Sequence, residues 1–336
     1  MIELDGSGGG GQLVRTALGL SALTGEAFEM ENVRGARSNA GLRHQHVAAT
    51  RAVAAVCDAD VEGDEVGSET VRFEPGPVNA GDVEVTVGTA GNLTLVFDAL
   101  LPVAYALDDT LTVAVEEAGT DVPHAPPIDY QRHAKLPLLR EYGVDATVDV
   151  DKRGFYPDGG GAATLTLDPS DATALDLSSR DSIKRLAVYS VATTELRAAE
   201  VAHRQAAHVE NALDLDVEIE ANADYVGAPS AGSVLVVVAE YEHSRAGFAR
   251  LGERGTPSES VADSVVQDFR DFRRSGAAVD ANLGDQLLPF LAVAGGEVAV
   301  PEATDHVDTC LDVLDAFGYP VAVEERADHV LLSRTE

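Results

Sequence analysis

The stretches GQLVR (11–15), GNLTL (91–95) and GDQLL (284–288) each place a glycine at the start of an apolar helical segment. After each of them the apolar pattern predicts a strand, a second helix and two more strands. The sequence therefore predicts an α/β (α+β) protein built on three repeated βαβαββ units. The segments expected to be regular are helices 11–23, 44–56, 127–142 and 307–317, a helix from 91 to about 107, and strands 27–33, 111–116 and 297–300.

An inserted segment separates the second copy from the third. Gly11 and Gly91 are 80 residues apart, whereas Gly91 and Gly284 are 193 residues apart. An excess of that size is enough for a small domain of its own. We therefore predict a large domain of residues 1–179 and 277–336 and an inserted α/β domain of residues 180–276, with a strand at 233–241 and a helix at 258–272.

The composition is strongly acidic. Among 336 residues, 57 are acidic and 24 basic, which gives a formal net charge of −33. Only three of the basic residues are lysines, and an acid-rich, lysine-poor surface suits a salt-saturated cytoplasm. A rival interpretation is that the acid repels nucleic acid and excludes an RNA enzyme, but molar salt screens such repulsion. A nucleic-acid site would then have to depend on local arginines and backbone N–H groups.

Other features exclude whole classes of protein. No apolar run reaches the ~18 residues of a membrane span, and the start MIELD lacks the basic and apolar parts of a signal peptide. Cys57 and Cys310 are the only cysteines, too few for a disulfide framework or a four-thiolate zinc site. We expect a cytoplasmic protein that does not enter a membrane.

A glycine-rich run, DGSGGGGQ (5–12), precedes the first predicted helix. Glycine lets backbone N–H groups crowd around an anion, and a helix N-terminus adds partial positive charge. The run lacks the lysine of a phosphate-binding P-loop, because Gln12 stands in its place. A tight turn without a ligand remains an alternative interpretation.

The segment RGARSNAGLRHQH (34–46) concentrates three arginines and two histidines and contains no acidic residue. Arginine binds phosphate in a two-pronged geometry, so the segment indicates a phosphate site. The alternative is a loop whose arginines pair with acidic neighbours. Elsewhere, His306 stands at the entry to the last predicted helix, where a capping, a core or a catalytic role is possible. No GxSxG or HExxH motif is present.

Taken together, these residues resemble the RNA 3′-terminal phosphate cyclase family across almost the whole chain, in the same order, with only the insert weakly matched. The stretches that carry the resemblance are DGS (5–7), GGGQLVR (9–15), RGAR (34–37) to QH (45–46), GTD (119–121), APP (125–127), RGFYP (153–157), GGG (159–161), DQL (285–287) and His306.

The resemblance implies repeats like the C-terminal fold of initiation factor 3. It also implies a ligase that uses ATP to turn the 3′-terminal phosphate of an RNA end into a 2′,3′-cyclic phosphate, releasing AMP and diphosphate. The steps pass through a covalent histidyl-AMP and an RNA-adenylate, and a divalent metal, Mg²⁺ or Mn²⁺, assists. His306 corresponds to the nucleophile. The positions corresponding to ATP-binding residues are Asp98, Asn282, Leu283, Gly284, Asp285 and Gln286, and those for phosphates of ATP or RNA are Gln12, Arg15, Arg34, Arg37, Arg43, Gln45 and His46.

Three positions depart from the family pattern. Gly8 stands where the family has a metal-binding glutamate, Asp98 replaces a glutamine, and Asn282 replaces an aromatic residue. The carboxylates that remain as candidates for the metal are Asp285, Asp98 and Asp5.

Two other functions are compatible with parts of the sequence. One is a non-catalytic relative acting in ribosomal RNA processing; His306 argues against it, because such relatives lack the nucleophile. The other is an enolpyruvyl transferase built from similar repeats, which would bind its substrate through lysines and arginines. The glycine-rich runs of this chain contain no lysine.

Overall fold

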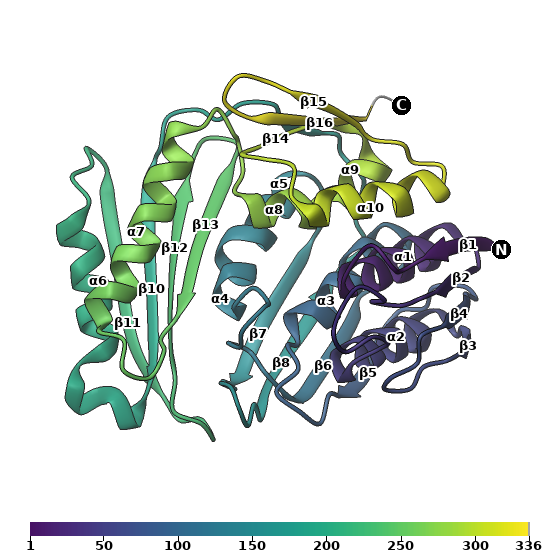
Figure 1. Cartoon of the computed structure of the whole chain (residues 1–336), viewed down its shortest axis with the longest axis horizontal. Coiled ribbons are helices and arrows are strands. Elements are labelled where there is room, and N and C mark those ends of the chain that lie inside the picture. Colours follow the sequence, from purple (N-terminus) through teal and green to yellow (C-terminus); the bar gives the residue numbers. More distant parts are fainter. Residues whose placement is uncertain (335–336) are drawn as a thin grey trace.

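The computed structural model describes residues 1–334 and has an α/β fold (Figure 1). Its first sheet has the strand order β1-β2-β4-β3. β1 is parallel to β2, while β4 is antiparallel to both β2 and β3. The strands are β1 (Ile2–Asp5), β2 (Phe28–Glu31), β3 (Asp60–Glu62) and β4 (Val71–Glu74).

Two further sheets repeat this order and these orientations. They run β5-β6-β8-β7 and β9-β14-β16-β15, and in each the first two strands in sequence are parallel and the other pairs antiparallel. Their strands are β5 (Gly81–Thr86), β6 (Leu111–Ala118), β7 (Ala146–Lys152), β8 (Gly161–Leu167), β9 (Leu175–Leu177), β14 (Gly296–Val300), β15 (Ala322–Glu325) and β16 (Val330–Arg334).

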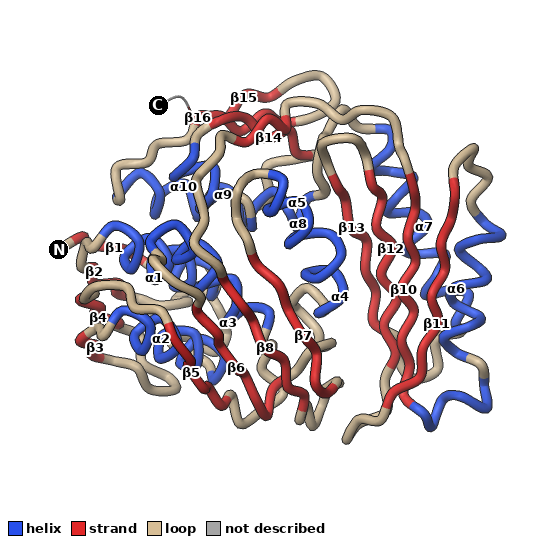
Figure 2. The backbone as a smooth tube through the Cα atoms, turned by 180° about the vertical axis from the view of Figure 1, so that it is seen from behind, coloured by secondary structure: helices blue, strands red, loops and turns tan. Residues whose placement is uncertain are grey.

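The helices of the three units pack together, with the sheets around them (Figures 1 and 2). The buried sides of these helices carry mostly apolar residues, so their packing against one another removes a large hydrophobic area from water. None of the helices within residues 1–334 has the length and apolar character needed to cross a bilayer. The helices are α1 (Gly11–Thr24), α2 (His44–Cys57), α3 (Thr94–Leu100), α4 (Ile128–Tyr130), α5 (Leu136–Glu141), α8 (Ala281–Gln286), α9 (Leu288–Ala294) and α10 (Asp305–Ala316).

Two predicted helices are less regular than expected. The helix predicted from 91 to about 107 begins at Thr94 and continues beyond Leu100 as a 3₁₀ turn, η1 (Leu101–Ala106). The helix predicted over 127–142 contains a π turn, η2 (Gln131–Lys135), between α4 and α5. Pro137 follows that turn, and a proline cannot donate the backbone hydrogen bond that a regular α-helix requires.

The inserted segment lies between β9 and α8, inside the third unit. Its sheet has the order β11-β10-β12-β13, and α6 and α7 cover one face with a hydrophobic cluster of their own. Val191, Val234, Val236 and Val238 on the other face belong to the main core, so β12 is buried on both faces of the sheet, whereas the edge strand β11 stays partly exposed. The elements are β10 (Arg185–Thr193), η3 (Thr194–Ala199), α6 (Val201–Ala212), β11 (Glu218–Val226), β12 (Ser233–Glu240), β13 (Arg245–Leu251) and α7 (Ser258–Arg274).

Two stretches of the resemblance, GTD (119–121) and RGFYP (153–157), meet in a buried ion-pair network. The guanidinium of Arg153 donates to both carboxylate oxygens of Asp121, at 3.3 and 3.0 Å, and of Asp129, at 2.7 and 2.6 Å. Both aspartates are nearly inaccessible to solvent. The network therefore joins β7, α4 and the loop after β6, and it acts as an internal support.

Candidate active site

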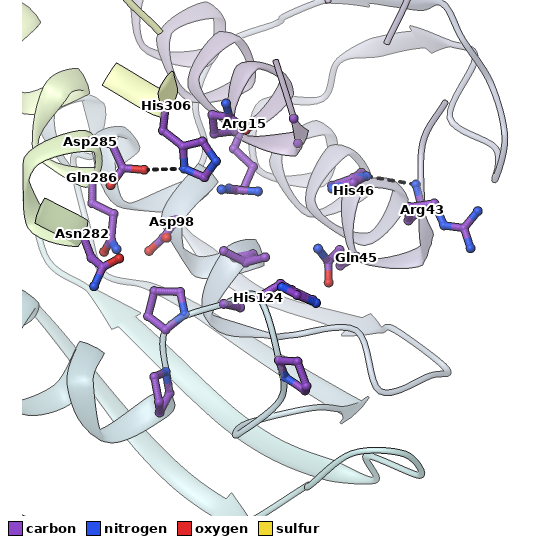
Figure 3. Close-up of a pocket in the computed structure, with 18 of the residues that line it drawn as sticks. Arg15, Arg43, Gln45, His46, Asp98, His124, Asn282, Asp285, Gln286 and His306 are labelled. Carbon is purple, nitrogen blue, oxygen red and sulfur yellow. Dashed lines mark hydrogen bonds and ion pairs between the residues drawn. The ribbon is translucent and has the colours of Figure 1, made fainter. Parts of the chain in front are cut away.

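A cavity of about 880 Å³ lies where the three units and the insert meet (Figure 3). The N-terminal ends of α1, α2 and α10 contribute to its wall, so backbone N–H groups and helix dipoles favour an anionic ligand there. The lining residues are Gly10, Gly11, Gln12, Arg15, Arg34, Arg37, Arg43, Gln45, His46, Leu95, Asp98, Pro123, His124, Ala125, Pro126, Pro127, Tyr130, Ala249, Arg250, Asn282, Asp285, Gln286 and His306.

His306 projects from the first turn of α10, which begins after the capping residue Thr304. Its Nδ1 lies 3.2 Å from Oδ2 of Asp285, and half of its side chain is exposed to the cavity (Figure 3). A carboxylate partner favours the tautomer with the proton on Nδ1. Nε2 then carries the free lone pair, so the ring is oriented as a nucleophile.

α8 supplies the residues beside His306. Asn282, Asp285 and Gln286 line the cavity, whereas the neighbouring Leu283 and Gly284 face the protein interior. Leu283 belongs to the main core, and a Cβ on Gly284 would lie 2.7 Å from Cγ1 of Val300. Of the five predicted ATP-binding residues on this helix, three thus reach the cavity, and the other two pack α8 against the main core.

The arginine-rich segment forms the opposite end of the cavity. Arg34, Arg37 and Arg43 all line it, and no carboxylate within residues 1–334 forms an ion pair with them. Arg34 instead donates to the backbone oxygens of Asn39 and Gly41, both at 2.8 Å. The alternative interpretation, a loop neutralised by acidic neighbours, is not what the structure contains.

Arg15 extends from α1 toward His306 (Figure 3). Burial lowers the pKa of its guanidinium, and the nearby charges of Asp98 and Asp285 oppose that shift. The cavity lining thus carries Arg15, Arg34, Arg37 and Arg43 against two aspartates, although the chain has a net charge of −33; a fifth arginine, Arg250, pairs with Asp268 at 2.6 Å. Such local excess positive charge in a partly enclosed site attracts phosphate groups.

His46 is buried beside the glycine-rich run. Its Nδ1 accepts a hydrogen bond from the backbone N–H of Arg43 at 2.9 Å, which leaves the proton on Nε2. Burial lowers its pKa to about 3, and the charges of Arg15, Arg34 and Arg43 act in the same direction. A Cβ on Gly11 would lie 2.0 Å from Nε2, so only glycine permits this contact. His46 is therefore a neutral hydrogen-bond donor at the arginine end.

The remaining predicted positions have different surroundings. Gln45 lines the cavity and accepts from the backbone N–H of Asn92 at 3.1 Å, and Gln12 donates to Thr309 at 3.2 Å. These two bonds tie the N-termini of α2 and α1 to their neighbours. Both glutamines thus fix the wall of the cavity as well as lining it.

The candidate carboxylates for a metal do not form one cluster. Asp98 accepts at its Oδ1 from the buried Nζ of Lys135 at 2.7 Å and from Gln131 at 3.2 Å. Asp5 bonds to Ser7 and Asn32 and is not among the lining residues. Within residues 1–334, no group of three or more histidine, cysteine or acidic side chains could hold a metal ion without other ligands.

Several lining residues were not predicted as site residues. The loop PHAPP (123–127) forms one wall, and His124 has a left-handed backbone conformation with φ of 66°. Its proline-rich composition could have indicated a wall of the site, because prolines give a rigid apolar surface. Arg250 on β13 had no such signal, since only folding brings the insert to the cavity.

The chain is similar to known proteins over almost its whole length. Residues 7–321 match the family model of RNA 3′-terminal phosphate cyclase. Proteins of that name from Halobacterium salinarum, Pyrococcus furiosus and Pseudomonas fluorescens are 52%, 40% and 37% identical to the chain. The alignments cover 98%, 94% and 97% of this chain and 98%, 93% and 94% of the respective relatives. The chain therefore belongs to the RNA 3′-terminal phosphate cyclase family.

Proposed function

We propose that the protein uses ATP to convert the 3′-terminal phosphate of an RNA into a 2′,3′-cyclic phosphate, with AMP and diphosphate as the other products. The observation that carries this proposal is His306, held by Asp285, in the same cavity as Arg34, Arg37 and Arg43, which form no ion pair with a carboxylate of residues 1–334. The family membership of the chain supports the same reaction.

In the first step, Nε2 of His306 attacks the α-phosphorus of ATP, and a P–N bond forms as the bond to diphosphate breaks. Asp285 holds the proton on Nδ1 and stabilises the ring as it becomes positive. Arg15 and the N-terminus of α10 neutralise charge that develops on the phosphate oxygens.

In the second step, an oxygen of the RNA 3′-phosphate attacks the phosphorus of the histidyl-AMP, which frees His306 and gives RNA-adenylate. The vicinal 2′-hydroxyl then attacks the RNA phosphorus, loses its proton and expels AMP, closing the ring. Arg34, Arg37 and Arg43 would hold the terminal phosphate during both transfers, and His46 would donate to it from Nε2.

The phosphates of ATP would supply some of the ligands of a bound metal ion. Magnesium is usually held by one or two carboxylates together with substrate phosphates. Asp98 and Asp285 line the cavity and fit that pattern, whereas Asp5 does not reach the lining. When bound, Mg²⁺ or Mn²⁺ would neutralise the departing diphosphate. At the nucleotide end, Asn282 and Gln286 are the residues we assign to ATP.

The proposal is tested with ATP labelled in its α-phosphate, magnesium or manganese, and high salt. We expect an acid-labile label on the protein and no label on His306→Ala. Equal labelling of both proteins would remove His306 from its role. Tight binding of RNA with neither labelling nor cyclisation would favour a non-catalytic function in ribosomal RNA processing.

We also propose that residues 180–276 form a domain of their own, inserted in a large domain of residues 1–179 and 277–336. The hydrophobic cluster that α6 and α7 form with one face of the inserted sheet supports this division, and the valines on the other face of the sheet pack against the main core. The acidic surface and the relative from Halobacterium salinarum support a salt-rich cytoplasm as the place of action, in the processing of RNA ends.

A further inference from the structure

Asp280 is a buried carboxylate outside the cavity that the mechanism above does not use. Only 4% of the residue is exposed, and within residues 1–334 no basic side chain forms an ion pair with it. A buried charge of this kind is costly unless hydrogen bonds satisfy it.

Four donors satisfy the two oxygens of Asp280, and they come from three segments. Oδ1 accepts from the hydroxyl of Tyr130 at 2.8 Å and from the backbone N–H groups of Asn282 and Leu283 at 3.0 and 3.2 Å. Oδ2 accepts from the backbone N–H of Gly247 at 2.8 Å. All four partners are donors, so both oxygens are acceptors. Burial raises the pKa of Asp280 to about 6, and these hydrogen bonds oppose that shift.

Each of the three segments carries residues of the cavity wall. Tyr130 of α4 lines the cavity itself, and Asn282 is the first residue of α8 that lines it. Gly247 lies two residues before Ala249, and Ala249 and Arg250 are the lining residues of β13. β13 is the edge strand of the inserted sheet, so some of its N–H groups face away from β12 and need another partner. Asp280 is the partner of one of them.

Near Asp280, the backbone of β13 also packs closely against α4. A Cβ on Gly247 would lie 2.4 Å from Cε2 of Tyr130, so β13 approaches α4 at a distance that only glycine allows. The inserted sheet therefore sits directly against the helix that borders the cavity. Its position fixes how far Ala249 and Arg250 stand from α8.

We propose that Asp280 is a positioning residue that fastens the inserted segment to the nucleotide end of the cavity, and so sets the width of the ATP site. This inference rests on the proposed use of ATP. It gives the insert a specific role: β13 is the third wall of the nucleotide site, and the carboxylate of Asp280 holds that wall against α8 and α4.

Asp280→Asn is the most informative variant. The amide keeps the size of the side chain, but only its oxygen can accept a hydrogen bond, since the NH₂ group is a donor. If the oxygen caps α8, the bond from Gly247 is lost; if it accepts from Gly247, the cap is lost. We expect the KM for ATP in RNA cyclisation to rise about tenfold while kcat stays within about threefold, because the site is misplaced rather than its reacting groups removed. Tyr130→Phe, which keeps the cap and the Gly247 bond, should raise KM by about threefold.

The matched control is Ser190→Ala, which removes a buried hydrogen bond of 2.8 Å from Ser190 of β10 to Gln205 of α6, within the insert but away from the cavity. It should leave the KM for ATP unchanged. If Asp280→Asn lowers only the amount of active protein and keeps the wild-type KM, the positioning role is wrong.

Two measurements decide the matter without catalysis. We expect Asp280→Asn to weaken ATP binding in an equilibrium titration by the same factor as KM, and to speed amide hydrogen exchange in residues 245–251 relative to Ser190→Ala. Unchanged ATP affinity and exchange would overturn the inference. Absence of labelling in the wild type would instead contradict the proposed function, and these two measurements would still test Asp280.

Discussion

Two groups of arginines in this molecule have opposite surroundings. The guanidinium of Arg153 faces four carboxylate oxygens and is enclosed, whereas Arg37 and Arg43 face the cavity without a carboxylate partner among residues 1–334. Both groups lie in stretches that carry the family resemblance. The comparison shows that stretches carrying the family resemblance can place their arginines either in a buried ion-pair network or on the wall of the cavity, and that the partners of the charges distinguish the two.

The largest expected effect comes from breaking the enclosed group. Arg153→Met leaves Asp121 buried without a cation and Asp129 with only the more distant Arg132, at 3.6 Å, and burial already raises the pKa of Asp121 against the effect of Arg153. We expect the free energy of unfolding to fall by about 3–5 kcal/mol, measured by denaturant titration at constant salt.

The control for Arg153 is Arg51→Met. Arg51 pairs with Asp64 at 2.7 Å on the surface, where both side chains are exposed. Its loss should cost less than about 1 kcal/mol. Equal losses for the two variants would mean that the Arg153 network contributes no more than a surface ion pair.

The arginines of the cavity should show the reverse behaviour. We expect the double variant Arg34→Ala with Arg37→Ala to reduce cyclisation by about 100-fold, because charge on the transferred phosphate loses its partners. Its free energy of unfolding should fall by less than about 2 kcal/mol, since only the two backbone hydrogen bonds of Arg34 are lost.

A double variant on α7, Arg270→Ala with Arg274→Ala, removes the same charge from the outer face of the insert. It should cyclise RNA at the wild-type rate. If the two double variants lose activity equally, the effect belongs to total charge and not to the cavity.

The burial of His46 beside the cavity arginines predicts how the stability of the protein depends on pH. The pKa of His46 is about 3 in the folded protein against 6.5 ordinarily, so between these values the unfolded chain binds a proton that the folded chain does not. Stability should therefore fall as pH drops from 6.5 toward 3, by up to about 1.4 kcal/mol per pH unit from this group. Denaturant titrations at several pH values should give a shallower slope for His46→Gln, and parallel curves would contradict the assignment.

The smallest expected effect concerns Gly8. A Cβ there would lie 3.8 Å from Cγ2 of Thr309, an ordinary contact, so a side chain fits near the start of α10. Gly8→Glu adds the carboxylate that the family pattern has at this position. We expect the magnesium concentration for half-maximal labelling to fall about threefold, with no change for Gly8→Gln. Equal magnesium requirements of the two variants would contradict this prediction.

Much of the architecture could be predicted from local pattern. The helix predicted over 44–56 is α2 (His44–Cys57), and that predicted over 307–317 is α10 (Asp305–Ala316). The helix expected over 127–142 is interrupted by a π turn. Hydrophobic spacing indicates where a helix lies, but it does not show how its turns adjust to buried partners such as Lys135 and Asp98.

The site could be predicted in part. The arginines of 34–43, Gln45, His46 and His306 do line one cavity, although they are far apart in the sequence. Leu283 and Gly284 lie in the same stretch as Asp285 but face the interior, because successive residues of a helix point in different directions.

The sequence by itself determined the α/β class and the family, and it predicted His306 as the nucleophile with arginines near it, because these inferences depend on residue types and their spacing. Only the tertiary structure decided which arginines are neutralised, that β13 borders the cavity, and that Asp280 holds it there. Coulombic and hydrogen-bond energies depend on distance and burial, and neither is fixed until distant segments have packed together.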